Sequence, residues 1–169
     1  MSIKSISIKA LITSIAMSCS VSAMAEMTSF KVAVIKDTTA SQEIISGDLA
    51  TSIAKLTSAD ESSFETHTGL CVAYLKSKII DKSVPACTAA IDSISSVQSY
   101  DRKKSYLQSL SYSNRGISRY LSNDIEGAMS DLSVAESINS NPITAGNLQL
   151  MKNKMIAMDE SSTDELLAD

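Results

Sequence analysis

The chain has 169 residues and a formal net charge of −4, and 44% of its residues are hydrophobic. This length suits one domain with a modest core. The acidic balance, and the lack of a Lys/Arg cluster interleaved with aromatic residues, argue against nucleic acid as a partner.

The N-terminus has the three parts of a secretory signal peptide. Lys4 and Lys9 make its start positive, residues 10–17 form an apolar run, and an Ala-Met-Ala motif ends the stretch. A membrane-spanning anchor is the alternative, but a span needs about 20 apolar residues and this run is much shorter. We therefore expect residues 1–25 to be removed by cleavage after Ala25, leaving a periplasmic chain without an integral membrane span.

A lipid anchor on Cys19 is a second alternative for the exported form. The preceding Ala16-Met17-Ser18 loosely resembles a bacterial lipoprotein box, which prefers Leu in the first place and a small residue where Met17 stands. In that form the protein would be a lipid-anchored accessory of envelope assembly.

Next in chain order is a short segment, residues 26–39, which contains the sequence FKVAVIKDTT and is expected to be extended or irregular. Helical patterns then follow over residues 40–158. The acidic end, residues 159–169, is expected to be a flexible tail.

Three stretches of the helical part share one frame, in which a small residue is followed by an apolar residue four positions on and by Ala three further on. The stretches are 47–59 (GDLATSIAKLTSA), 79–91 (IIDKSVPACTAAI) and 123–135 (NDIEGAMSDLSVA). Their frame residues are Ser52, Leu56 and Ala59; Ser83, Cys87 and Ala90; and Ala128, Leu132 and Ala135. Each stretch follows another helical pattern, so the sequence predicts a series of helix-turn-helix units.

The ends of the later helices are also indicated. Asn123 or Asp124 is expected to cap the second helix of the third unit, and Asn141-Pro142 is expected to end it. A closing helix is predicted over residues 143–158, with Leu148, Met151, Met155 and Ile156 on one face.

These units resemble the tetratricopeptide repeat (TPR) family, whose pattern has Leu-Gly-x2-Tyr in the first helix, small residues in the second and a final proline. The matching residues are Leu70, Tyr74 and Ala90 in the second unit, with Cys71 in place of glycine, and Gly116, Ala128, Ala135 and Pro142 in the third. The resemblance covers roughly residues 40–142. It implies an all-α fold, a short array of antiparallel helix hairpins arranged as an α-solenoid.

The spacing departs from the family's period of about 34 residues. Ser52 and Ser83 are 31 residues apart, and Ser83 and Ala128 are 45 apart. The extra residues fall in QSYDRKKSYLQ (98–108), which contains neither Pro nor Gly. We expect this stretch to lengthen the flanking helices.

Cys71 and Cys87 are the two cysteines that remain after the predicted cleavage, and they are sixteen positions apart. That spacing is neither a CxxC redox motif nor a multi-ligand zinc pattern. Facing positions on two helices joined by a short turn, in an oxidising compartment, favour a disulfide. The alternative is two reduced cysteines packed as small apolar side chains.

No nucleophile elbow, phosphate-binding glycine loop or paired-histidine motif is recognisable in the sequence. We therefore expect a non-enzymatic protein with no catalytic residues, metal or cofactor. The TPR resemblance implies a concave surface, lined mainly by the first helix of each pair, that binds a partner protein or peptide. The implied lining residues are Glu65, Thr68, Val72, Leu75, Lys76, Asn114, Ile117, Tyr120 and Leu121.

Two alternatives stay open from the sequence. In one, the protein is a redox- or stress-responsive factor that uses Cys71 and Cys87 as a switchable pair. In the other, Ile117 and Leu121 are core residues rather than part of a binding surface. Some TPR proteins bind a terminal carboxylate with a set of basic residues and asparagines. In this sequence Asn114 belongs to such a set, and the other positions are Glu, Thr or apolar.

Overall fold

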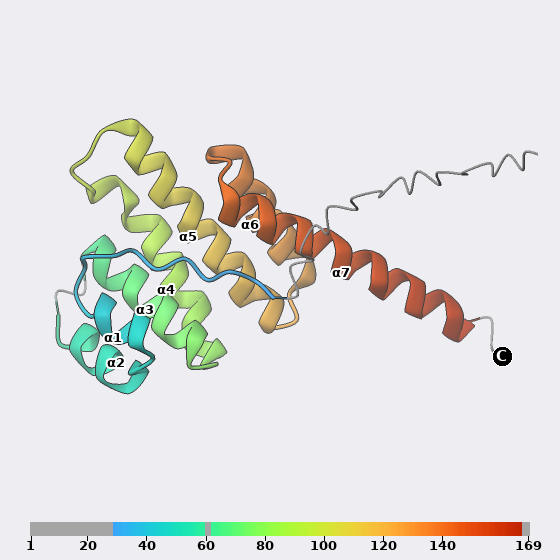
Figure 1. The fold of residues 1–169 in the computed structure, drawn as a ribbon, viewed down its shortest axis with the longest axis horizontal. Coiled ribbons are helices and arrows are strands. Elements are labelled where there is room, and N and C mark those ends of the chain that lie inside the picture. The colour runs from blue at the N-terminus through green and yellow to red at the C-terminus, as the bar shows by residue number, and fades with distance from the viewer. Residues whose placement is uncertain (1–28, 60–61, 167–169) are drawn as a thin grey trace, which may run out of the picture.

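A computed structural model describes residues 29–59 and 62–166, with side chains described as far as Glu160. The predicted signal peptide and Cys19 lie outside these residues. The described part is all-helical, with seven α-helices, one 3₁₀-helix and no strand (Figure 1). The helices are α1 (Ser41–Ser46), α2 (Leu49–Thr57), α3 (Phe64–Lys76), α4 (Ile80–Asp92), η1 (Ser93–Ser96), α5 (Asp101–Leu121), α6 (Ile125–Ile138) and α7 (Pro142–Leu166).

The predicted frame residues form the closely packed faces of α2, α4 and α6. Eight of the nine are fully buried, because each lies where its helix meets a neighbouring helix. Ala59 is half-buried because α2 ends at Thr57, two residues before it. Antiparallel helices approach this closely only where small side chains meet, so the frame positions the hairpins.

The crossing of α5 and α6 shows how little room the frame leaves. A Cβ atom added to Gly116 would lie 2.8 Å from Cγ of Leu132 and 3.2 Å from the backbone oxygen of Ala128. Gly116 and Ala128 therefore lie at a close helix crossing.

Side-chain caps define where α2, α3 and α6 begin. Asp48, Ser63 and Asp124 each accept a hydrogen bond from a backbone N–H in the first turn of the helix that follows. Of the two cap candidates for α6, Asp124 is the one that caps, accepting from Gly127 N at 2.9 Å. Asn123 instead has φ 66° in the α5–α6 turn, a left-handed conformation that asparagine tolerates.

The predicted disulfide between Cys71 and Cys87 is present and joins α3 to α4. Its Cα atoms are 4.6 Å apart, inside the usual window of about 4.4–6.8 Å. Both residues are buried.

Two predicted boundaries differ from the structure. The extra residues 98–108 lengthen only α5, which has 21 residues, while residues 97–100 form a connection after η1. The tail predicted from residue 159 begins within α7, which continues to Leu166. Residues 159–166 contain neither Pro nor Gly, and extending an existing helix requires no new nucleation step.

Pro142, expected to end the preceding helix, is the first residue of α7. Proline suits this position because the first N–H groups of a helix have no partner within the helix. Among the described residues, no helix is both long and apolar enough to cross a membrane.

Candidate functional site

The segment before α1 lies across the helices rather than apart from them. In Figure 1 it runs as a thin tube from the end of the molecule that holds α1 and α2, past α5 and toward α7. It includes residues 29–35, which we call the N-terminal segment, and these have no helix or strand structure. We call the helix surface beneath it, formed by α3, α5 and α7, the groove.

Two buried asparagines bind the backbone of this segment. Asn114 of α5 accepts a hydrogen bond from Ala33 N at 2.9 Å and donates one to Ala33 O at 2.9 Å. Asn147 of α7 does the same with Lys31, at 2.8 and 2.9 Å. With the segment in place both asparagines are 0% exposed, so the four hydrogen bonds pair buried amides with the buried backbone groups they face.

Ser113 of α5 holds Asn147 in place. The Nδ2 atom of Asn147, which donates to Lys31 O, also donates to Oγ of Ser113 at 2.9 Å. Ser113 is buried. The amide of Asn147 is therefore oriented by α5 as well as by the segment, and this contact links α5 to α7.

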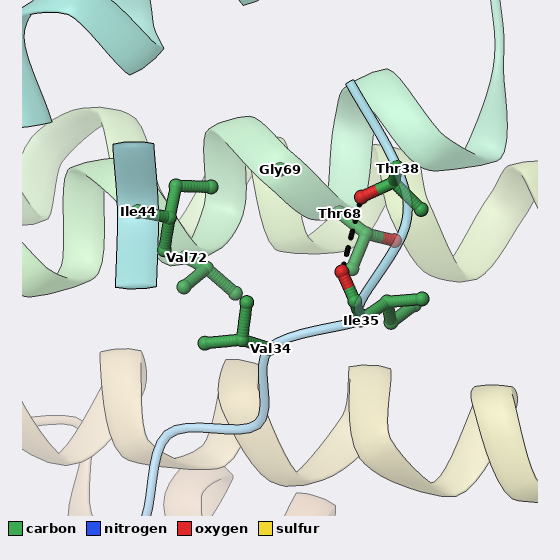
Figure 2. Close-up of a pocket in the computed structure, with 7 residues that line it drawn as sticks. All are labelled: Val34, Ile35, Thr38, Ile44, Thr68, Gly69 and Val72. Atoms are coloured by element: carbon green, nitrogen blue, oxygen red, sulfur yellow. Dashed lines mark hydrogen bonds between the residues drawn. The ribbon is translucent and has the colours of Figure 1, made fainter. Parts of the chain in front are cut away.

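The segment's apolar side chains pack into two separate clusters. Val32 and Val34 pack against a core cluster formed by α1, α2 and α3, which includes Val72. Figure 2 shows Val34 beside Val72 and Ile44 at this site. Phe30 packs against the cluster formed by α6 and α7.

Phe30 also makes the segment's aromatic contact. Its ring lies edge-on to Tyr120 of α5, with ring centroids 5.1 Å apart and an interplanar angle of 61°. The ammonium group of Lys154 in α7 lies 5.5 Å from the centroid of the same Tyr120 ring. Tyr120 is thus enclosed by the segment on one side and by α7 on another.

An apolar hollow of about 280 Å³ lies beside the segment. We call it the Tyr120 hollow, and its lining residues are Ser29, Phe30, Val32, Leu75, Ile117, Tyr120, Leu121 and Lys154. Leu121 is 49% exposed and forms part of its rim. The hollow therefore joins the segment's apolar side chains to a surface that a further side chain can reach.

The structure brings together part of the predicted lining set. Leu75, Ile117, Tyr120 and Leu121 share the Tyr120 hollow, and Asn114 lies on the same helix as three of them. Ile117 is buried and also lines the hollow, so it is a core residue at the hollow's inner wall.

The other predicted lining residues lie elsewhere. Thr68 and Val72 are buried at a small cavity of about 10 Å³ under Val34 (Figure 2). Lys76 donates to the backbone oxygen of Ile44 at 2.9 Å. Glu65 lines a separate hollow that also contains residues 35–39.

Sequence reasoning missed Asn147 and the role of the N-terminal segment. Asn147 falls 33 positions after Asn114, close to the family period of about 34 residues, and that spacing was an available signal. The segment itself was expected only to be extended, because its partners are 81 and 116 positions away in the chain.

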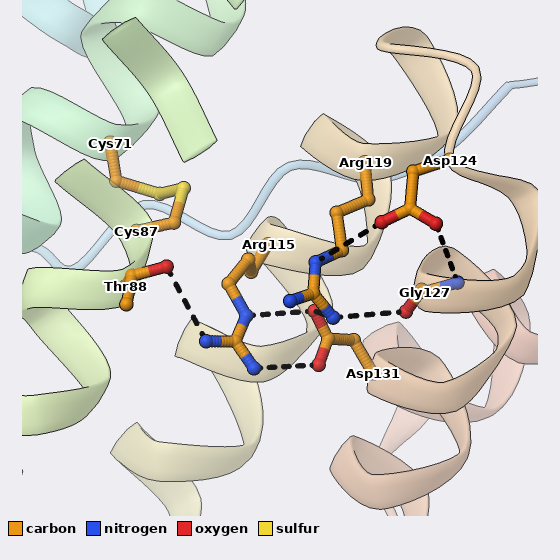
Figure 3. Close-up of polar contacts among 8 residues, drawn as sticks. All are labelled: Cys71, Cys87, Thr88, Arg115, Arg119, Asp124, Gly127 and Asp131. Atoms are coloured by element: carbon orange, nitrogen blue, oxygen red, sulfur yellow. Dashed lines mark hydrogen bonds and ion pairs between the residues drawn. A yellow bond between two sulfur atoms is a disulfide. The ribbon is translucent and has the colours of Figure 1, made fainter. Parts of the chain in front are cut away.

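On the other side of α5, a network of charges binds the helices to one another (Figure 3). Arg115 donates to both carboxylate oxygens of Asp131 at 2.8 Å, and to Oγ1 of Thr88 at 3.4 Å. Arg119 reaches the same carboxylate at 3.0 Å. The hydrogen bonds that Arg115 donates to Asp131 raise the pKa of the Arg115 guanidinium, and Asp131 is almost fully buried.

This network joins α4, α5 and α6, and its groups are already paired with one another. No cluster of three or more potential metal ligands occurs among the described residues. Both described cysteines are in the disulfide, so neither provides a free thiol.

Comparison with known proteins gives no match: neither a family model, nor a curated protein, nor a solved structure corresponds to this chain. The chemistry of the groove is therefore the main guide to function. An asparagine amide that pairs with both the N–H and the C=O of one residue recognises an extended backbone whatever its side chains.

Proposed function

We propose that this protein is a non-catalytic periplasmic interaction module, a short TPR-like array of helical hairpins that binds an extended segment of a partner protein in the groove. The partner's segment lies along α3, α5 and α7, and one of its side chains occupies the Tyr120 hollow.

The observation that carries this proposal is the pair of asparagine contacts to one extended chain, which in this structure is the protein's own N-terminal segment. Asn114 and Asn147 each use both amide groups on a single residue, and those residues are two positions apart. Buried amides and buried backbone groups are both costly without partners, and these contacts pair the two, so the groove suits an extended chain. The Tyr120 hollow adds an aromatic surface, the residue type that dominates binding energy at interfaces.

A redox-responsive role for Cys71 and Cys87 is less well supported. Thiol–disulfide exchange requires a thiolate to reach one of the two sulfurs, and both residues are buried. The disulfide at the α3–α4 crossing is better explained as a structural bond that holds the hairpin closed.

A photo-crosslinking residue at position 121 tests the proposal in the cell. Leu121 lines the Tyr120 hollow and is exposed, so a partner bound in the groove forms an adduct there. The matched control places the same residue at Ser133, which is exposed on α6 and does not line the hollow. Adducts at position 121 but not at 133 support the proposal; equal adducts at both, or none at either, contradict it.

A further inference from the structure

We propose that the groove selects a segment with the pattern aromatic–any–Val–Ala–Val, as in residues 30–34, and that the chain's own copy of this pattern is a resident ligand that a partner segment replaces. This inference rests on the proposed function and adds the chemistry of the partner. The backbone contacts, the side chains and the connection to α1 each support it.

The backbone contacts fix the register. Asn147 binds Lys31 and Asn114 binds Ala33, so the two contacts are two residues apart along the segment. An extended chain advances about 3.3 Å per residue, and residues two apart present their N–H and C=O groups to the same side. A segment displaced by one residue would turn these groups away from both asparagines.

The asparagine contacts along the segment end at Ala33. The position in α3 that would provide the next asparagine holds a glycine. Gly69 stands in α3 where Asn114 stands in α5, 45 positions later in the chain. A Cβ atom at Gly69 would lie 2.8 Å from Cδ2 of Leu56, so this position cannot accept an asparagine without a shift of Leu56. The carbonyl of Ile35 accepts from Oγ1 of Thr38 instead, at 3.0 Å (Figure 2).

The side chains of residues 30–34 define the pattern. Ala33 is 3% exposed, so its position accepts only a small residue. Val32 and Val34 pack against the cluster that contains Val72, and Phe30 packs on Tyr120. Lys31 is exposed, and its position accepts any residue except proline, which has no N–H for Asn147.

The connection to α1 weakens the hold of the chain's own segment. Asp37 and Ala40, between the segment and α1, have φ values of 60° and 61°. These are left-handed conformations, which are unfavourable for alanine and less so for aspartate. A free partner segment with the same pattern occupies the groove without adopting this turn, so it can replace the resident segment.

A full-length A33R variant tests the inference, because an arginine at this buried position displaces the chain's own segment. The probe is a fluorescent peptide with the sequence of residues 29–35, SFKVAVI. We expect A33R to bind it at least tenfold more tightly than the wild-type chain does, because the resident competitor has been removed. A peptide with Arg in place of Ala, a scrambled peptide, and the double variant A33R/N114A should all show at least tenfold weaker binding.

A second variant covers the case in which A33R does not fold, as judged by its helical circular dichroism. F30A/V32A weakens the resident segment by truncation alone, and it should bind the same peptide more tightly than the wild-type chain does. Hydrogen exchange at the amides of Lys31 and Ala33 provides an independent reading, since excess peptide added to the wild-type chain should speed their exchange.

The outcomes separate the two proposals. Equal binding of the cognate and scrambled peptides overturns the selected pattern but leaves groove binding intact. No peptide binding to a folded variant, with adducts still formed at position 121, overturns this inference and leaves the proposed function standing. Loss of both peptide binding and adducts overturns both.

Discussion

The α3–α4 and α5–α6 hairpins share one frame of residues, 45 positions apart, but their crossings are closed by different chemistry. In the first, Cys71 and Cys87 form a disulfide. In the second, the same two positions hold Gly116 and Leu132, and a Cβ on Gly116 would lie 2.8 Å from Cγ of Leu132. One crossing is closed by a covalent bond, and the other by a leucine packed on bare backbone.

The neighbouring positions differ in the same way. The α5–α6 hairpin has the buried pair Arg115 and Asp131, whereas the corresponding positions in α3–α4 hold Leu70 and Ala86. The comparison shows that a shared frame sets only how closely the helices approach. Each hairpin then has its own stabilising contact, and each can be removed separately.

The largest effect is expected from Asp131→Ala. This change leaves the guanidinium groups of Arg115 and Arg119 without the buried carboxylate they share, and removing one partner of a buried ion pair costs about 3–5 kcal/mol. Urea denaturation should show a loss near the lower end of that range, because both arginines are partly exposed to solvent. Ser133→Ala, an exposed change on the same helix, is the control; a similar small change for both variants would show that the network does not stabilise the hairpin.

Removing the disulfide should cost somewhat less. For a closed loop of about 15 residues, the chain-entropy model gives about 3 kcal/mol, so Cys71→Ala with Cys87→Ala should lower the free energy of unfolding by about that amount. The matched variant Cys71→Gly with Cys87→Leu gives α3–α4 the residues of the other crossing. It should recover part of the loss, with a melting temperature that does not respond to reductant; no recovery would mean that the two crossings are not interchangeable.

The smallest expected effect compares Thr68 of α3 with Ser113, its counterpart in α5. Oγ1 of Thr68 is buried and has no hydrogen-bond partner among the described residues, whereas Oγ of Ser113 accepts from Asn147. A buried polar group without a partner destabilises the folded state. Thermal denaturation should therefore show Thr68→Val to be neutral or stabilising by up to about 1 kcal/mol, and Ser113→Ala to be destabilising by about 1 kcal/mol. The reverse order of the two would contradict this assignment.

The helices, the frame and the disulfide could be predicted because their signals are local. Ala128, Leu132 and Ala135 lie on one face at helical spacing, and Cys71 and Cys87 fall on facing positions of one hairpin. Of the expected lining residues on α3, Leu75 lines the Tyr120 hollow and the others lie apart from it. Thr68 and Val72 are buried beneath Val34.

The groove contacts could not be predicted because they join distant parts of the chain through the backbone. Asn114 binds the N–H and C=O of Ala33, groups that every residue except proline has, so the sequence of the segment does not mark them. A repeat spacing links Asn114 to Asn147, but spacing alone does not say what these amides bind. The end of α7 at Leu166 was missed because an acidic sequence without Pro or Gly is compatible with either helix or tail.

The order in which the chain is made bears on how the N-terminal segment reaches its place. Residues 31 and 33 leave the ribosome early, but their partners Asn147 and Asn114 come 116 and 81 positions later. Contacts between such distant residues form slowly, because a long loop must close before they stabilise anything. The hairpins, whose contacts are local, form sooner. The segment that is synthesised before all the described helices is therefore expected to dock after them, as the last step of folding.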